Sequence, residues 1–169
     1  DYRGFGLTGG EATQDHLVED VQDAIDWLAS KGLKGQQLTL YGYSLGSYPA
    51  TYLMKASTSL TARRLILENP FSSTSAMSSD ATGLSFPSAL VMDDTFDNQE
   101  HIKKVHQPFL WFHGLADDFL PVATHGQVVW DNYNGNQGTK YMVEGAEHSN
   151  LPEVMGYKAY LQAVEGFMK

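Results

Sequence analysis

The sequence predicts an α/β fold in which a mostly parallel sheet is covered by helices on both faces. The first observation is size: 169 residues, 42% of them hydrophobic, suffice for one domain with a core of its own. The second is that segments with the apolar spacing of a helix alternate with short apolar runs typical of buried strands. Repeated alternation of strand and helix is typical of parallel sheets with helices on both faces.

The first half of the chain is predicted to contain two helices and two strands. Apolar residues recur at helical spacing over 17–28, and this helix is expected to end near Lys31, a basic residue followed by glycine. Residues 36–41 then indicate a short strand, a helix runs through Met54, and residues 64–68 indicate a second, buried strand. The apolar positions of the first helix are Leu17, Val18, Val21, Ala24, Ile25 and Leu28.

The second half continues the alternation after an interruption. Residues 71–107 break the pattern with serines, glycine and proline. A strand is then predicted over 109–113, a helix over 124–130 and a strand over 140–144. The chain closes with one helix, whose apolar side consists of Val154, Tyr157, Leu161, Val164 and Met168.

The composition excludes several classes of function. A net charge of −9 with no Lys/Arg cluster argues against nucleic acid or an anionic membrane as a partner. The absence of cysteine excludes disulfides, thiolate catalysis and Cys-based zinc sites. We expect no cofactor and no metal, because the acidic residues lack the spacing of a calcium loop. No apolar run has the length of a membrane span, so a soluble protein is expected. No signal peptide is visible, but the chain does not begin with methionine, and the compartment stays open between cytoplasm and periplasm.

The chain begins with a glycine-rich stretch, GFGLTGG at residues 4–10, whose first six residues match the G-x-G-x-x-G spacing of dinucleotide-binding loops. That fingerprint requires a strand directly before the first glycine and a helix opening at the second, so that helical N–H groups face a pyrophosphate. Only Asp1, Tyr2 and Arg3 precede the first glycine, and helical spacing starts several residues later. We therefore interpret the stretch as a glycine-rich turn rather than a nucleotide site.

The residues that follow the first predicted strand, GYSLG at 42–46, place a serine between two glycines where a strand turns into a helix. This is the G-x-S-x-G pattern of a nucleophile elbow, in which the serine occupies a sharp, strained turn. Side chains at the flanking positions, Gly42 and Gly46, are expected to collide with the neighbouring strand and helix. Ser44 is therefore the predicted nucleophile, with an ordinary turn serine as the alternative.

Two further polar clusters follow predicted strands, HGLADD at 113–118 and GAEH at 145–148. In parallel sheets the ligand site lies at the carboxyl ends of the strands. A serine hydroxyl needs an imidazole to take its proton and a carboxylate to hold that imidazole in the right tautomer. The order Ser44, Asp117, His148 along the chain is the order of an α/β-hydrolase triad.

Both the acid and the histidine have competitors. Asp118 adjoins Asp117, and two adjacent acids in a loop are typical of a solvated pair, but the spacing after His113 favours Asp117. Five other histidines compete with His148. His113 ends a strand, where we expect it to be packed and hydrogen-bonded. The remaining histidines are expected at the surface: His16, His101, His106 and His125.

Taken together, the chain resembles the α/β-hydrolase fold family, and within it the small-lid serine hydrolases of the serine-aminopeptidase-like and acyl-thioesterase-like branches. The matching stretches cover nearly the whole chain in order: DYRGFGLTGG, GYSLGSYPA, FDNQEHIKKVHQPFLWFHGLADDFLP and GAEHSN. The resemblance implies a single hydrolase domain over residues 1–169, forming the C-terminal portion of the full fold. It also implies that the opening stretch is a turn near the rim of the active site.

The resemblance further implies what surrounds the triad. The backbone N–H of Leu45 would be one donor of the oxyanion hole, and the other would come from strands upstream of Asp1, which the chain lacks. The insert over 71–107 corresponds to a lid. Its apolar side chains either line an acyl or aromatic pocket over Ser44 or pack the lid onto the sheet: Met77, Leu84, Phe86, Leu90, Val91, Met92 and Phe96. The candidate substrate-binding residues are Phe71, Phe86 and Phe119.

Two functions remain open on this basis. The first is a serine hydrolase that cleaves carboxylic esters or thioesters, or else peptides and amides, through an acyl-enzyme on Ser44. Its partner is then a small-molecule ester, thioester or peptide substrate. The second is a non-catalytic hydrolase-like binding module, in which the incomplete oxyanion hole leaves the triad inactive. The intact triad favours the first function.

Overall fold

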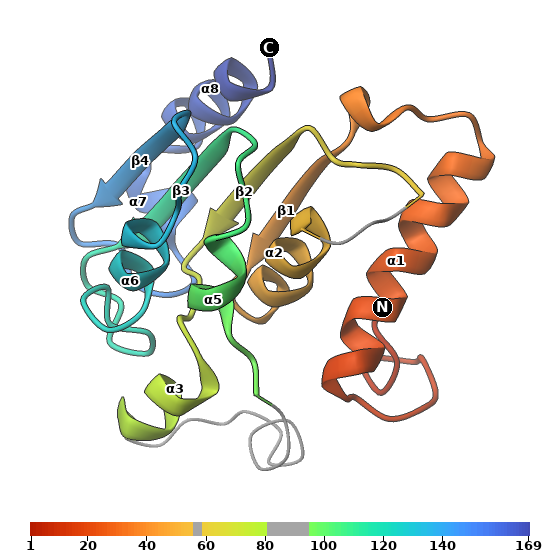
Figure 1. The fold of residues 1–169 in the computed structure, drawn as a ribbon. Coiled ribbons are helices and arrows are strands. Elements are labelled where there is room, and N and C mark those ends of the chain that lie inside the picture. The colour runs from red at the N-terminus through yellow and green to blue at the C-terminus, as the bar shows by residue number, and fades with distance from the viewer. Residues whose placement is uncertain (56–58, 81–94) are drawn as a thin grey trace.

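A computed structural model describes residues 1–55, 59–80 and 95–169. Its centre is a sheet of four strands in the order β1-β2-β3-β4, and every neighbouring pair is parallel. Figure 1 shows the strands side by side and pointing the same way. Their bounds are β1 (Thr39–Tyr43), β2 (Arg64–Glu68), β3 (Phe109–Gly114) and β4 (Gly138–Val143).

Helices cover both faces of this sheet. Figure 1 shows α2, α5 and α6 on one face with α1 beside α2, whereas α7 and α8 lie on the other face. The predicted fold class, a mostly parallel sheet with helices on both faces, is confirmed. The helices are α1 (Gln14–Ser30), α2 (Ser47–Lys55), α3 (Thr74–Asp80), α5 (Asn98–Ile102), α6 (Gly126–Asp131), α7 (Leu151–Met155) and α8 (Tyr157–Met168), with short 3₁₀ helices η1 (Gly35–Gln37) and η2 (Ser44–Gly46).

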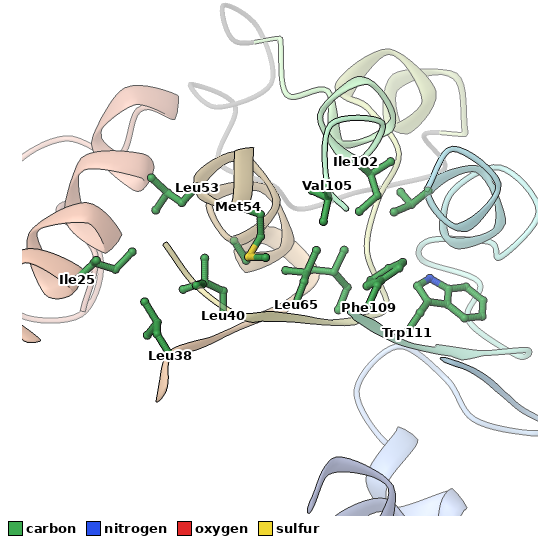
Figure 2. Packing of buried hydrophobic residues seen from close by; sticks show 14 residues of the cluster. Ile25, Leu38, Leu40, Leu53, Met54, Leu65, Ile102, Val105, Phe109 and Trp111 are labelled. Carbon is green, nitrogen blue, oxygen red and sulfur yellow. The ribbon is translucent and has the colours of Figure 1, made fainter. Parts of the chain in front are cut away.

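The alternation of side chains along the strands divides the apolar residues between the two faces. Leu65 of β2 and Trp111 of β3 point to the face that carries α2, where they pack with Met54 and Ile102 (Figure 2). Residues one position along point the other way, and Ile66 joins a separate cluster under α7 and α8 that also contains Leu110, Phe112, Ala146 and Leu151. Because both faces are buried, β2 and β3 have no exposed position.

Several strand and helix boundaries differ from the sequence prediction by one to three residues, and two of the differences have a clear physical reason. The first strand starts at Thr39 rather than at residue 36, because the chain over Gly35–Gln37 forms a 3₁₀ turn closed by the Leu38 N–H to the Gly35 carbonyl. The predicted closing helix is two helices, because Gly156 between them has φ of 85°. A left-handed residue at that position ends α7 and redirects the chain into α8.

The described parts of segment 71–107 are packed against the rest of the molecule. Ile102 and Val105 at its end are fully buried in the cluster with α2. Met77 and Phe96 are buried with Phe71 in another cluster, which favours packing over pocket lining for these two. The other expected lid side chains lie outside the described residues: Leu84, Phe86, Leu90, Val91 and Met92. The assignment of the segment as a lid stays a prediction.

The glycine-rich opening stretch forms a turn, as interpreted from the sequence. Gly4 has φ of 79°, and a Cβ there would lie 2.7 Å from the Ala12 nitrogen. The turn is held against α1 by Arg3, whose guanidinium donates to Asp20 at 2.6 Å and to Glu19 at 2.8 Å. No helix opens at the second glycine, since α1 begins only at Gln14.

Candidate active site

Ser44 occupies a tight turn between β1 and α2. Its φ of 48° lies in the left-handed region, which is strained for a residue with a side chain. Gly42 permits this turn, because a Cβ there would lie 2.5 Å from the Gly46 oxygen and 2.6 Å from the Ser47 Cα. The collision expected for a side chain at Gly46 is not found: among the described residues, a Cβ there would meet only the Tyr2 hydroxyl, at 3.8 Å.

Three predicted side chains meet at the carboxyl ends of the strands. The Ser44 Oγ lies 2.9 Å from His148 Nε2, and His148 Nδ1 lies 2.8 Å from Asp117 Oδ2. A carboxylate can only accept, so the imidazole donates its Nδ1–H to Asp117. Nε2 is then the acceptor for the Ser44 hydroxyl proton, which is the tautomer that a general base requires.

Asp117 and its neighbour Asp118 have different surroundings. Asp117 is 4% exposed, and its Oδ1 accepts from the backbone N–H groups of Phe119 at 3.0 Å and Leu120 at 2.8 Å. Its other oxygen is thereby aimed at His148. Asp118 is exposed to solvent. The structure therefore brings Asp117, and not Asp118, to the histidine.

The remaining predicted site residues occupy three different situations. Leu45 directly follows Ser44 in η2, so that its backbone N–H belongs to the same turn. Phe119 is partly buried, and the centroid of its ring lies 4.7 Å from the centroid of the His148 ring. Phe71 is fully buried and packs edge-on against Phe96, so a substrate would reach its ring only after neighbouring side chains move. Phe86 lies outside the described residues.

Two residues that the sequence prediction missed hold the histidine loop in place. Asn69, directly after β2, donates from Nδ2 to the His148 carbonyl at 2.6 Å and accepts the Gly114 N–H on Oδ1 at 2.9 Å. The Tyr43 hydroxyl donates to the same His148 carbonyl at 3.0 Å. Asn69 has a φ of 44°, in the left-handed region that asparagine adopts more readily than most residues, and these two hydrogen bonds stabilise that conformation. Its place at the carboxyl end of a strand was the available signal.

The other histidines are not all at the surface. His113 is buried as expected, and its Nε2 donates to the Leu120 carbonyl at 2.9 Å. His125 was expected at the surface, but it is fully buried where Ser72 N–H donates to its Nδ1 at 3.2 Å. Burial lowers the pKa of both imidazoles. His125 directly precedes α6, whose first residue, Gly126, lies against the His113 ring of β3. A local sequence pattern does not reveal this contact, so the surface prediction for His125 was wrong. His106 is exposed, and His16 and His101 are partly buried.

Two negative findings apply to the described residues only. Within 1–55, 59–80 and 95–169, no cluster of three or more His, Asp or Glu side chains is arranged to bind a metal ion. In the same part of the chain, none of the helices combines the length and the apolar composition needed to cross a bilayer.

Comparison with known proteins concerns the fold, and no family model matches the chain. Human α/β hydrolase domain-containing protein 17B is 28% identical over 171 residues, covering 99% of this chain and 54% of that protein. An esterase from Pyrococcus furiosus has a TM-score of 0.81 at 16% identity, covering 99% of this chain and 67% of that one. A monoacylglycerol lipase from Paleococcus ferrophilus has a TM-score of 0.66 at 18% identity, covering 99% and 81%.

The chain spans about half the length of the curated relatives that it matches. The solved structures are distant in sequence, and their agreement extends over nearly all of this chain. At these identities the likeness concerns the fold, which in this chain is a parallel sheet with helices on both faces. The chain therefore has the α/β-hydrolase fold.

Proposed function

We propose that the protein is a serine hydrolase that cleaves carboxylic esters or thioesters through an acyl-enzyme on Ser44. The observation that carries the proposal is the continuous series of hydrogen bonds from Ser44 through His148 to Asp117. A residual triad in a binding module has no need of this geometry, and the strained turn at Ser44 would then be a cost without a use.

The proposed reaction has two halves. In the first, the Ser44 Oγ attacks the substrate carbonyl while His148 Nε2 takes its proton, and Asp117 stabilises the imidazolium. The same proton then passes to the leaving alcohol or thiol as the carbonyl carbon–heteroatom bond breaks. In the second half, water attacks the acyl group with its proton going to His148, and the carboxylic acid leaves as Ser44 regains a proton.

The oxyanion formed in each half needs donors at fixed positions. We assign the Leu45 backbone N–H as one of them, because it follows the nucleophile within the turn. In the fold the second donor comes from a loop after an earlier strand. Each such donor contributes about 10² to 10³ in kcat.

The names of the structural neighbours support esters as the substrate class. They include esterases and a monoacylglycerol lipase, alongside an acylaminoacyl peptidase that keeps peptides as an alternative. The Phe119 ring against His148 offers an apolar surface beside the nucleophile, suited to the acyl or alcohol part of an uncharged substrate. We also propose that segment 71–107 acts as a lid, and that the protein belongs to the serine-aminopeptidase-like or thioesterase-like branch of serine hydrolases.

A fluorophosphonate probe tests this function directly, because it reacts only with an activated serine. We expect labelling of the whole protein at Ser44, located by peptide mass mapping, and loss of labelling in Ser44→Ala. The same variant should lower kcat for a short p-nitrophenyl ester by several powers of ten. Ser79→Ala is the matched control, since Ser79 is an exposed serine of α3. Absence of labelling in the parent protein would favour the non-catalytic binding module instead.

A further inference from the structure

Strand β2 has a charged residue with little exposed surface at each of its ends. Arg64 begins the strand and is 8% exposed, and Glu68 ends it and is 4% exposed. Because side chains two or four residues apart share one face of a strand, both charges lie on the face that α8 covers. Four residues of strand separate them by about 13 Å, too far for a direct ion pair.

The charge at the carboxyl end has partners. The Tyr160 hydroxyl of α8 donates to Glu68 Oε2 at 2.6 Å, and the Tyr41 hydroxyl of β1 donates to the same oxygen at 2.5 Å. Together with burial, the Glu68 carboxylate raises the pKa of both tyrosines. A buried carboxylate with two donors is the usual arrangement for a stable buried charge.

The charge at the amino end has no such partner. Within the described residues, no carboxylate forms an ion pair with Arg64 and no acceptor for its guanidinium is found. Burial of the side chain, together with the like charge of Arg63, lowers the pKa of Arg64. No Arg64 nitrogen is among the buried polar atoms of the described residues that lack a hydrogen-bond partner, so the guanidinium is open to solvent and accessible to an anion.

Arg64 lines a hollow of about 560 Å³ at the amino ends of β2, β3 and β4. Arg63 lines it as well, and no Asp or Glu side chain does. This composition is unusual for a chain with 20 acidic and 11 basic residues. The other walls supply apolar surface from Ala163 and Phe167 of α8, and polar groups from Gln162 and Thr139.

The hollow is separate from the candidate active site. Ser44, Asp117 and His148 follow the carboxyl ends of the strands, whereas the hollow lies at the opposite ends, about 15 to 20 Å away. Figure 1 shows the C-terminal end of α8 at the same end of the sheet as the starts of β2, β3 and β4. A ligand bound in this hollow, which we name the amino-end pocket, would not meet the nucleophile.

We propose that the amino-end pocket binds a small organic oxyanion, a carboxylate or a phosphate monoester, with the anion on Arg64 and Arg63 and its apolar part against Phe167. A guanidinium matches both anions because its fork of N–H groups donates to two oxygens at once. The volume exceeds that of a bare inorganic anion and lies in the range of ligand pockets. The apolar wall of α8 is the reason for an organic rather than an inorganic occupant.

Isothermal titration of the whole protein with inorganic phosphate, phenyl phosphate and benzoate tests the proposal. We expect saturable binding of at least one organic anion, tighter than that of inorganic phosphate because only the organic ligands cover Phe167. The comparison of phenyl phosphate with benzoate decides which anion the pocket prefers. Arg64→Gln should weaken binding by at least about tenfold, and the exposed Arg63→Gln by less. Lys158→Gln is the control, an equal change of charge on the exposed side of α8.

The position of binding is measured independently by amide chemical shifts. The ligand should perturb Thr139 and Gly166, which line the pocket, and leave the Ser44 and His148 amides unchanged. If Arg64→Gln does not fold, Arg63→Gln and the shift map decide. The proposal is overturned if none of the three anions binds, if both arginine variants bind as the parent does, or if only active-site amides move. Because no turnover is measured, these outcomes are independent of the proposed hydrolase activity.

Discussion

The turn that carries Ser44 and the loop that carries His148 are held by different kinds of contact. The serine turn is local: Gly42, Ser44 and the first residues of α2 contact one another, and a side chain at Gly42 would strike atoms only four and five residues away. The histidine loop depends on distant residues, since Asn69 and Tyr43 lie 79 and 105 residues from the His148 carbonyl that they bind.

This difference indicates where each part of the site is vulnerable. A change within the serine turn should act through backbone strain, and few other positions can compensate for it. The histidine depends on several separate hydrogen bonds, so that changes there should have graded effects. The acid is the extreme case, because it is the single group that sets the tautomer of His148.

The largest effect is expected at the acid. Asp117→Asn should lower kcat for a p-nitrophenyl ester by about 10⁴, because an amide NH₂ facing Nδ1 favours the tautomer in which Nε2 carries the proton. Asp118→Asn is the matched control and should cost less than about tenfold, since its side chain is exposed. Steady-state kinetics of both variants measure the two losses in kcat. If the losses are equal, or if Asp118→Asn loses more, the acid is Asp118 and not Asp117.

The next effect concerns the local turn. Gly42→Ala should lower kcat/KM by at least about a hundredfold, because the new Cβ displaces the Gly46 and Ser47 backbone and with it the Ser44 Oγ. The control is Gly9→Ala, at an exposed glycine of the opening turn where a Cβ meets no atom within 4 Å. Near-parental kinetics for Gly42→Ala would contradict the local account of the serine turn.

A smaller effect is expected where the histidine loop is held. Asn69→Asp keeps the acceptor for the Gly114 N–H but replaces the donor to the His148 carbonyl, so kcat should fall by about tenfold or more with KM unchanged. Tyr43→Phe removes the second donor to that carbonyl and should cost only about two- to tenfold. If Tyr43→Phe has the larger effect, the order of these two contacts in positioning the loop is reversed.

The smallest effect concerns stability and pH. The pKa values of His113 and His125 are lowered by burial, so the unfolded chain binds protons more readily than the native one as the pH falls below about 6.5. The free energy of unfolding should therefore fall in that range, by at most about 1.4 kcal/mol per pH unit for each histidine. Urea unfolding between pH 7 and 5 measures this. His125→Gln should reduce the slope, and exposed His106→Gln should leave it unchanged.

Local patterns in the sequence predicted some elements better than others. Residues 64–68 were predicted as a buried strand with the bounds that the structure gives, because β2 is apolar and buried on both faces. The strand expected over 36–41 starts later, since a polar stretch without a clear period does not reveal a 3₁₀ turn. The break at Gly156 was missed because apolar spacing continues across it.

The residues of the candidate site were also predicted only where a local sequence pattern identifies them. Each of Ser44, Asp117 and His148 could be found from the sequence because it follows a predicted strand in a short pattern with a known chemical requirement. Asn69 could not be distinguished from other loop amides, because its role depends on contacts with β3 and with the histidine loop. His125 was misplaced for the same reason, as its burial comes from Ser72 and the start of α6.

The sequence by itself determined the order of the four strands, the fold class and the identity of three residues that meet, because these follow from apolar period and from turn chemistry within a few residues. Only the tertiary structure decided which oxygen of Asp117 faces His148, which residues hold the histidine loop, and that Arg64 and Glu68 are buried with unequal partners. Those facts depend on which elements meet in space, and contacts between residues tens of positions apart leave no periodic trace in the chain.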